Sequence, residues 1–278
     1  MSTAVFIIIV ATFILSYRGF ANEAFFDGYK FEVDKILVKK DYIRLVSSGF
    51  LHVSWQHLIL NMITLLFFSG ALAGYVGVIT FLIIYFASMI SGDLLSLFIH
   101  RNHSDYSSVG ASGAVCGVIF ASIALFPGMG INFFFLPISI PAWIYGLVYV
   151  LFSIYGIRSG KANIGHDAHL GGALAGMFIA LLFYPSAFAE NYFTILIIAV
   201  PVIVFIYIIV TRPAVLLVDN FFFKTHTDHY SIDHKYNEER TNKQNEIDRI
   251  LDKISQGGMK SLSKKEKEML HEYSKTVK

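Results

Sequence analysis

A serine surrounded by small residues is the first part of the chain whose residue types suit chemistry. Residues 110–117 are Gly-Ala-Ser-Gly-Ala-Val-Cys-Gly, and Ser112 stands at the start of an apolar stretch. Small neighbours leave room for a substrate backbone to reach the hydroxyl, while Gly113 and Gly117 have the spacing that lets two membrane helices approach closely. The segment is therefore a candidate nucleophile site or, alternatively, a packing motif in which the serine is incidental.

A histidine opens a later apolar stretch in a similar setting. His169 stands three residues before Gly172, and Gly176 follows with the same four-residue glycine spacing. On a helix, His169 lies about one turn from Gly172 and on nearly the same face. If the two glycine faces meet, Ser112 and His169 lie at similar depth, and the imidazole can take the serine proton. The alternative is a structural histidine near the membrane interface.

A third polar pair lies near the start of an earlier apolar stretch. His57 and Asn61 are four residues apart, so they share a helix face. Both donate hydrogen bonds, and donors aimed at the oxyanion of acyl transfer stabilise its transition state. The alternative is that these side chains satisfy each other or a neighbouring helix. Ser54 suits a helix N-cap, whereas His52 falls on a different face and suits a structural role.

The composition predicts that membrane helices position these residues. The chain of 278 residues is 55% hydrophobic and 15% charged, which is too apolar for a soluble domain. Residues 58–92 and 106–157 contain no Asp, Glu, Lys, Arg or His. Because a membrane helix needs about 20 apolar residues, each of these stretches holds two spans joined by a short turn. The single cysteine, Cys116, excludes an intrachain disulfide.

Hydropathy and turn residues together predict seven spans. Their expected bounds are about 2–17, 53–73, 76–99, 112–126, 134–156, 166–184 and 192–211. The first has no basic leader before it and is interpreted as a retained span. A long amphipathic loop, 18–50, is expected at the interface, and residues 212–278 are expected to form a polar tail containing a small helical hairpin. In that tail Ser263 and Glu266 have the spacing of a capping box.

The three polar positions lie at the same ends of spans two, four and six, which puts them on one side of the membrane. Two other interpretations remain. A metal centre would use His166 and His169 with Asp167 or the earlier histidines, but the chain has no His-Glu-x-x-His element. A transporter would need buried ionisable residues along a path, and Asp93 is the acidic candidate within a span.

A set of motifs in this order resembles the rhomboid family of intramembrane serine proteases. The matching residues are Arg44, His52, His57-x-x-x-Asn61, Gly110-x-Ser112-Gly113 and His169-x-x-Gly172-x-x-x-Gly176. The resemblance covers residues 1–185. It implies an all-α, polytopic membrane helix bundle with a six-helix core, to which residues 186–211 would add a seventh span and residues 212–278 a small helical tail.

The resemblance also implies roles for individual residues. Ser112 would be the nucleophile and His169 the general base, without an acidic third member. His57, Asn61 and the Ser112 backbone N–H would form the oxyanion hole, and Arg44 would brace the first loop, unless it is an ordinary interfacial anchor. One position departs from the family: four residues after the serine, where members often have an aromatic ring against the histidine, this chain has Cys116.

The expected function is therefore cleavage of membrane-anchored proteins in or near their transmembrane segments. The resemblance implies no cofactor, metal or nucleic-acid partner, a multi-pass position in the lipid bilayer, and a bacterial cell membrane. Span five would gate the substrate, since Pro137, Pro141 and Gly146 suggest loose or kinked packing. The alternatives are an inactive rhomboid-like protein that binds membrane clients, or a small transporter.

Orientation is a point on which two lines of reasoning disagree. Every Lys and Arg lies in the first loop, at residues 101, 158 and 161, or in the tail, on the same side as the polar positions. The positive-inside rule would put that side in the cytoplasm, whereas the resemblance implies the opposite. We follow the resemblance, because the rule weighs short loops and the tail exceeds its range of about 60 residues.

Overall fold

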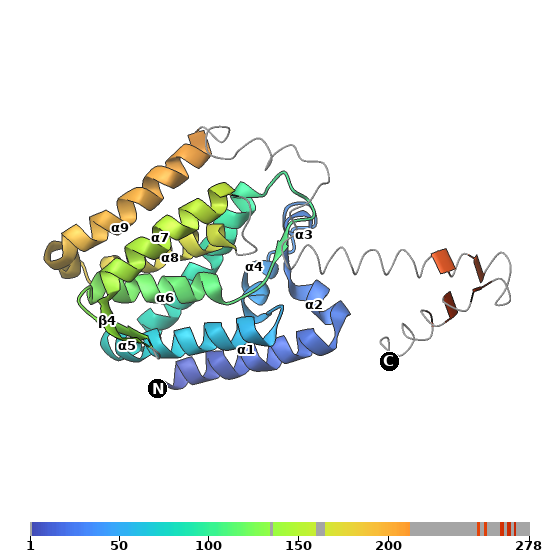
Figure 1. Cartoon of the computed structure of the whole chain (residues 1–278), viewed down its shortest axis with the longest axis horizontal. Coiled ribbons are helices and arrows are strands. Elements are labelled where there is room, and N and C mark those ends of the chain that lie inside the picture. Colours follow the sequence, from blue (N-terminus) through green and yellow to red (C-terminus); the bar gives the residue numbers. More distant parts are fainter. Residues whose placement is uncertain are drawn as a thin grey trace. The chain divides into compact units, whose positions relative to one another are not determined.

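The computed structural model describes residues 2–133, 136–159 and 165–211, together with residues 249–250, 253–254, 262–263, 266–267 and 270 of the tail. The chain forms two units, Met1–His229 and Tyr230–Lys278. The helices of the first unit are α1 (Thr3–Ala21), α2 (Glu23–Tyr29), α3 (Val33–Leu37), α4 (Arg44–Ser47), the 3-10 helix η1 (Ser48–Phe50), α5 (Trp55–Ile99), α6 (Ser112–Leu125), α7 (Ala142–Ser159), α8 (His166–Phe183) and α9 (Ser186–Thr211). They form the helical bundle of Figure 1.

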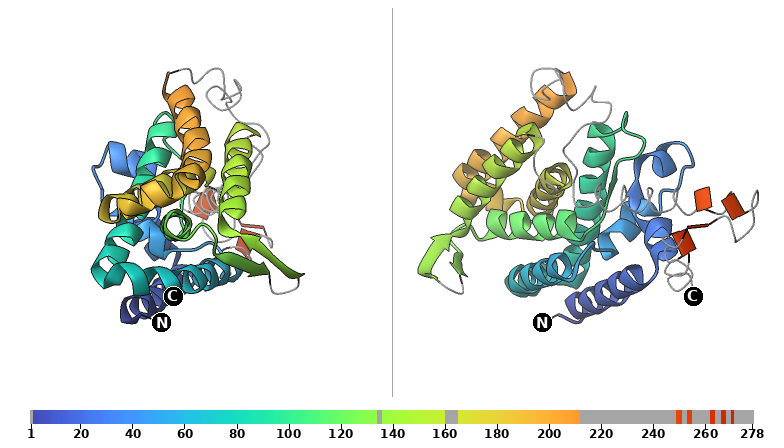
Figure 2. Two further views of the ribbon diagram at one scale, coloured as in Figure 1. Left: turned by 90° about the vertical axis from the view of Figure 1, so that its left-hand side faces the viewer. Right: turned by 45° about the vertical axis from the view of Figure 1, so that its right-hand side comes forward.

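Helix α5 contains two membrane spans. A straight helix of 45 residues would be about 68 Å long, more than twice the apolar thickness of a bilayer. The chain breaks direction at Gly77, whose φ of +77° lies in the left-handed region that glycine adopts without strain. The limbs before and after Gly77 run in different directions (Figure 2). This break confirms the turn predicted between spans two and three.

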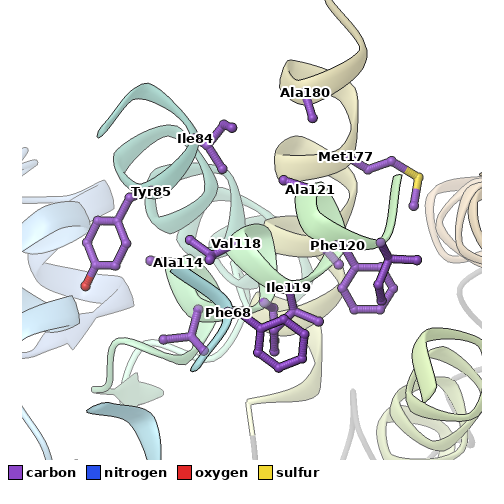
Figure 3. Packing of buried hydrophobic residues seen from close by; sticks show 14 of the residues in the cluster. Phe68, Ile84, Tyr85, Ala114, Val118, Ile119, Phe120, Ala121, Met177 and Ala180 are labelled. Atoms are coloured by element: carbon purple, nitrogen blue, oxygen red, sulfur yellow. The ribbon is translucent and has the colours of Figure 1, made fainter. Parts of the chain in front are cut away.

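Helix α6 lies at the centre of the bundle. Every residue from Gly113 to Leu125 is buried, and α6 contacts α5, α7, α8 and α9. Figure 3 shows Val118 and Ala121 of α6 among side chains of α5, such as Ile84, and of α8, such as Met177. A helix buried on all sides is apolar all round, which explains why residues 113–125 show no polar face.

The outer helices expose apolar side chains. Ile7 of α1, Ile79 of α5, Val148 of α7, Phe178 of α8 and Tyr207 of α9 are all more than half exposed. Large apolar surfaces of this kind are stable against lipid and unstable against water. Helices α1, α5, α8 and α9 are long and apolar enough to cross a membrane, and α6 and α7 are shorter apolar helices. The chain is thus a multi-pass integral membrane protein.

The start of span five differs from the expectation. Residues from 134 onward were expected to be helical, but strands β3 (Gly130–Phe133) and β4 (Leu136–Pro141) form an antiparallel pair there, and helix α7 begins at Ala142. Proline fits the first turn of a helix without cost, whereas inside a helix it removes a hydrogen bond and bends the chain. Pro141 therefore precedes α7, and Pro137 lies in β4 instead of kinking a helix.

The first loop is more ordered than a simple interfacial segment. It contains α2, α3, α4 and η1, and its strand β1 (Phe31–Glu32) pairs with β2 (Ser107–Ser108). Arg44 is buried and its guanidinium bridges the loop. Nε bonds Asp41 Oδ2 at 2.8 Å, while Nη1 donates to the carbonyl oxygens of Asp27 and Lys30 at 2.8 and 2.7 Å. Arg44 thus connects three positions of the first loop, Asp27, Lys30 and Asp41.

In the second unit, the described tail residues pack together. Ile250 and Leu262 are buried, with Ile254 and Leu270 against them. Ser263 and Glu266 form the predicted capping box, because the Ser263 N–H donates to Glu266 Oε2 and the Glu266 N–H donates to Ser263 Oγ. Most of the predicted hairpin lies outside the described residues.

Candidate active site between helices α6 and α8

A seam of glycines joins α6 to α8. A methyl group at Gly172 would collide with the carbonyl oxygen of Gly113, and one at Gly176 would collide with that of Gly117. The two backbones therefore touch directly, which requires glycine at positions 172 and 176 of α8. The glycine faces of α6 and α8 therefore meet.

The seam brings Ser112 and His169 into the same region. Ser112 is the first residue of α6, and His169 lies in the first turn of α8. A methyl group on Gly113 would lie 3.5 Å from the carbonyl oxygen of Ala168, so the residue after Ser112 lies near the backbone just before His169, and it touches Gly172, about one turn after His169. Ser112 is half-buried and His169 is buried. The arrangement has the groups that a serine nucleophile and its base require.

The ring of His169 is held by a residue that the sequence analysis did not select. The hydroxyl of Tyr149, in α7, lies 2.8 Å from His169 Nδ1 and 3.1 Å from Cys116 Sγ. Cys116 therefore leaves room for a phenol from another helix, where an aromatic residue four positions after the serine would occupy that room. Tyr149 stands one turn after Tyr145 in an apolar helix. This position alone does not indicate a role in the site, because tyrosines are common near membrane interfaces.

The acidic neighbour of His169, Asp167, has a partner of its own. The Asp167 carboxylate pairs with His100 Nε2 at 3.1 Å, and the His100 ring stacks on Tyr106 with centroids 3.6 Å apart. His166 is buried against Phe152 and Gly156. Within the described part of the chain, no three side chains of His, Cys, Asp or Glu come together as a metal ion requires. Asp167 thus stabilises the contact between α5 and α8.

His57 lies against the backbone shortly before Ser112, and Asn61 follows His57 by one turn of α5. Gly110, with a φ of +135°, packs its backbone against the His57 ring, and a methyl group there would lie 2.7 Å from Cε1. Ser54 caps α5, since its Oγ accepts the His57 N–H at 3.2 Å. The Asn61 amide donates to the His57 carbonyl at 3.0 Å. In this conformation the His57 ring faces the segment before Ser112, while Asn61 is bonded to its own helix.

His52 connects α1 to the start of α6. The Ala111 N–H donates to His52 Nε2 at 3.4 Å, and His52 Nδ1 lies 2.9 Å from Ser16 Oγ. Burial, together with the nearby His57, lowers the pKa of His52 to about 3. The ring is therefore neutral at pH 7, and an acceptor at Nε2 implies that Nδ1–H donates to Ser16. His52 is fully buried and its contacts are structural.

Two other expectations concern packing. Gly146 was expected to loosen span five, but a methyl group there would lie 2.8 Å from Ile123 Cδ1 and 3.2 Å from Ile198 Cδ1, so it is a site of close contact. Asp93, the acidic candidate of a transport path, accepts a hydrogen bond from Ser48 Oγ at 2.9 Å and is a packed polar group.

Comparison with known proteins identifies two families along the chain. Residues 39–186 match the rhomboid domain, and residues 230–276 match a family of unknown function (DUF6576). Rhomboid protein 1, mitochondrial, of Saccharomyces cerevisiae is 33% identical over 156 residues, which cover 54% of this chain and 45% of that protein.

Two further relatives show the same partial coverage. RHOMBOID-like protein 12, mitochondrial, of Arabidopsis thaliana is 32% identical over 145 residues (46% of this chain, 43% of that protein). Rhomboid protease GluP of Bacillus subtilis is 28% identical over 147 residues (53% and 27%). The chain spans less than half the length of each of these relatives. Since the rhomboid domain covers more than half of the chain and the structure is a helical membrane bundle, the protein belongs to the rhomboid family.

Proposed function

We propose that the chain is an intramembrane serine endopeptidase that cleaves membrane-anchored proteins by means of Ser112 and His169. The observation that carries the proposal is the glycine seam, which places the start of α6 against the first turn of α8. The name of the Bacillus subtilis relative, a rhomboid protease, supports the same activity. An inactive rhomboid-like protein would be expected to lack one of the two residues, and this chain has both.

The reaction would follow the chemistry of acyl transfer. Ser112 Oγ attacks the carbonyl carbon of the scissile peptide, and its proton passes to His169 Nε2. The oxyanion is stabilised by the His57 ring, the Ser112 N–H and the Asn61 amide, which must first leave the His57 carbonyl. The imidazolium then protonates the leaving amine, and water hydrolyses the acyl-enzyme with His169 again as base.

The substrate class follows from the place of the site. Ser112 opens a helix that lies inside a bundle with a lipid-facing exterior. A peptide bond in or near a transmembrane segment reaches such a site from the bilayer, past α7. We propose membrane-anchored proteins as the substrates, with residues 1–185 as the catalytic core, residues 186–211 as an added span and residues 212–278 as an accessory tail.

The membrane and the orientation belong to the proposal as well. A bacterial cell membrane agrees with the Bacillus subtilis relative, whereas the yeast and Arabidopsis thaliana relatives are named mitochondrial, which speaks against it. Fractionation of the native source decides between them. Alkaline phosphatase fused after residue 160 should be active if the Ser112 side faces away from the cytoplasm.

Cleavage of a model transmembrane protein by the purified chain in detergent tests the proposal. The wild-type chain should cut it, and Ser112→Ala should not, while keeping the same thermal unfolding midpoint. Cleavage retained by Ser112→Ala, in a preparation free of other proteases, would remove Ser112 from the mechanism. A folded wild-type chain that captures the substrate without cutting it would favour the inactive client-binding alternative.

A further inference from the structure

Helix α7 contacts His169 through the hydroxyl group of Tyr149. Tyr149 Oη lies 2.8 Å from His169 Nδ1, within hydrogen-bonding distance. The two rings are not stacked, since their centroids are 6.0 Å apart and their planes are inclined by 34°. Replacing Tyr149 by phenylalanine would therefore remove the polar contact and keep the ring. This makes the role of the hydroxyl testable on its own.

The direction of the hydrogen bond between Tyr149 Oη and His169 Nδ1 is linked to which nitrogen of His169 carries the proton. A neutral imidazole has one N–H and one free nitrogen, and a general base needs its free nitrogen toward the serine. If Nδ1–H donates to Tyr149 Oη, the hydroxyl proton is free to point at Cys116 Sγ, 3.1 Å away. Cys116 Sγ accepts this hydrogen bond, although weakly. His169 Nδ1, Tyr149 Oη and Cys116 Sγ are then joined by two hydrogen bonds, and His169 Nε2 keeps its lone pair. The opposite direction would put the proton on Nε2 and block proton transfer from Ser112.

We propose that Tyr149 is the positioning residue of His169 and fixes, through Nδ1, the tautomer that leaves Nε2 free for Ser112. The inference rests on the Ser112 and His169 pair of the proposed function. In a catalytic triad a carboxylate holds this place. Here the neighbouring carboxylate, Asp167, is paired with His100, and a neutral phenol holds the base.

The position of Tyr149 in α7 ties the base to that helix. Helix α7 contacts α8 where Gly156 meets His166, and it contacts α9 where Gly146 meets Ile198. Any movement of α7 away from α8 separates Tyr149 Oη from Nδ1. If substrates pass α7 on their way to Ser112, His169 is aligned for proton transfer once α7 lies against α8 again.

Two matched variants test the proposal. Tyr149→Phe removes the hydroxyl that faces His169, and Tyr155→Phe removes one from the same helix at a position that is 66% exposed. We expect Tyr149→Phe to lower kcat about 10- to 100-fold, less than the 10²–10⁴-fold typical of a lost general base, with KM changed less than about twofold. Labelling of Ser112 by a small fluorophosphonate should slow to the same extent, and Tyr155→Phe should match the wild type in both.

A spectroscopic measurement reads the tautomer directly. In chain labelled with ¹⁵N-histidine, with the His169 signal identified by its absence in His169→Ala, the wild type should show protonated Nδ1 and unprotonated Nε2. A wild-type His169 with the proton on Nε2 would overturn the proposal even if Tyr149→Phe does not fold. Unchanged kcat and labelling in folded Tyr149→Phe, or an equal loss in Tyr155→Phe, would overturn it too. Inactive Ser112→Ala beside fully active Tyr149→Phe refutes the role of Tyr149 alone, whereas active Ser112→Ala refutes the dyad itself.

Discussion

Two contacts of helix α8, one with α6 and one with α7, act on the same histidine in different ways. The contact with α6 is backbone against backbone, at Gly113 with Gly172 and at Gly117 with Gly176. The contact with α7 at His169 is made by a side chain, the hydroxyl of Tyr149. Backbones in direct contact cannot adapt to an added atom, whereas a side-chain hydrogen bond opens with a small movement. The first contact fixes where His169 lies and the second fixes how its ring is turned.

The largest expected effect comes from breaking the glycine seam. Gly176→Leu would force a side chain into the backbone of Gly117, which packed helices cannot accommodate by a rotamer change. We expect the variant to lose both its cooperative thermal unfolding and its proteolytic activity. Gly74→Leu is the control, because no heavy atom lies within 4 Å of a methyl group there. A folded, active Gly176→Leu protein would show that the seam does not hold α6 against α8.

Removing the proposed base is expected to have the next largest effect. His169→Ala should lower kcat by about 10²–10⁴-fold, the range typical of a general acid–base group, with the fold intact. His166→Ala removes an imidazole that packs on Phe152 and Gly156, and it should change kcat by less than about fivefold. The measurement is kcat for a transmembrane substrate. A larger loss of kcat in His166→Ala than in His169→Ala would show that His166, and not His169, lies on the face of α8 that meets Ser112.

Substitutions in the proposed oxyanion hole should lower kcat less than loss of the base does. The two residues of the hole, His57 and Asn61, should contribute unequally. His57→Ala removes a ring that lies on the backbone just before Ser112, and we expect kcat to fall about tenfold to a thousandfold. Asn61→Ala should lie at the small end of that range, because the amide is bonded to the His57 carbonyl and must turn to act. Steady-state kinetics give the answer. Changes confined to KM would mean that these residues only position substrate.

The smallest effect concerns His52, where the start of α6 contacts α1. The pKa of His52 in the fold is about 3, below the ordinary 6.5, so the unfolded chain binds the extra proton between these values. Stability from this group is present above pH 6.5 and is lost as the pH falls toward 3. His52→Asn should flatten the pH dependence of the free energy of unfolding by up to about 1.4 kcal/mol per pH unit. An identical slope in both proteins, measured in mixed micelles, would contradict the assignment.

The apolar helices and the glycines of the seam were predictable because each appears as a residue pattern within one continuous segment. Long uncharged stretches predicted the spans, and a four-residue glycine spacing predicted two faces able to meet. The short turn between spans two and three and the capping box at Ser263 follow from residue types alone. Local rules suffice for such features, since they depend on neighbours in sequence.

The remaining features depend on contacts between distant segments. Hydropathy does not separate an apolar strand from an apolar helix, so strand β4 was expected to be part of a helix. Tyr149 was missed because its importance lies in its partners, Cys116 and His169, which are far away in the sequence. The Asn61 amide can donate either to the His57 carbonyl or to the oxyanion of the reaction. The helix face that Asn61 shares with His57 does not decide between these two acceptors.

Labelling with a fluorophosphonate tests the central claim, that the α6–α8 contact makes a reactive pair of Ser112 and His169. The probe is small and bonds covalently to an activated serine, so the result does not depend on a natural substrate. The wild-type chain in detergent should be labelled at Ser112, as read by mass spectrometry of its peptides. Ser112→Ala should not be labelled, and His169→Ala should be labelled at least about a hundredfold more slowly. Absence of label from the folded wild-type chain, or equal labelling of His169→Ala, would contradict the account.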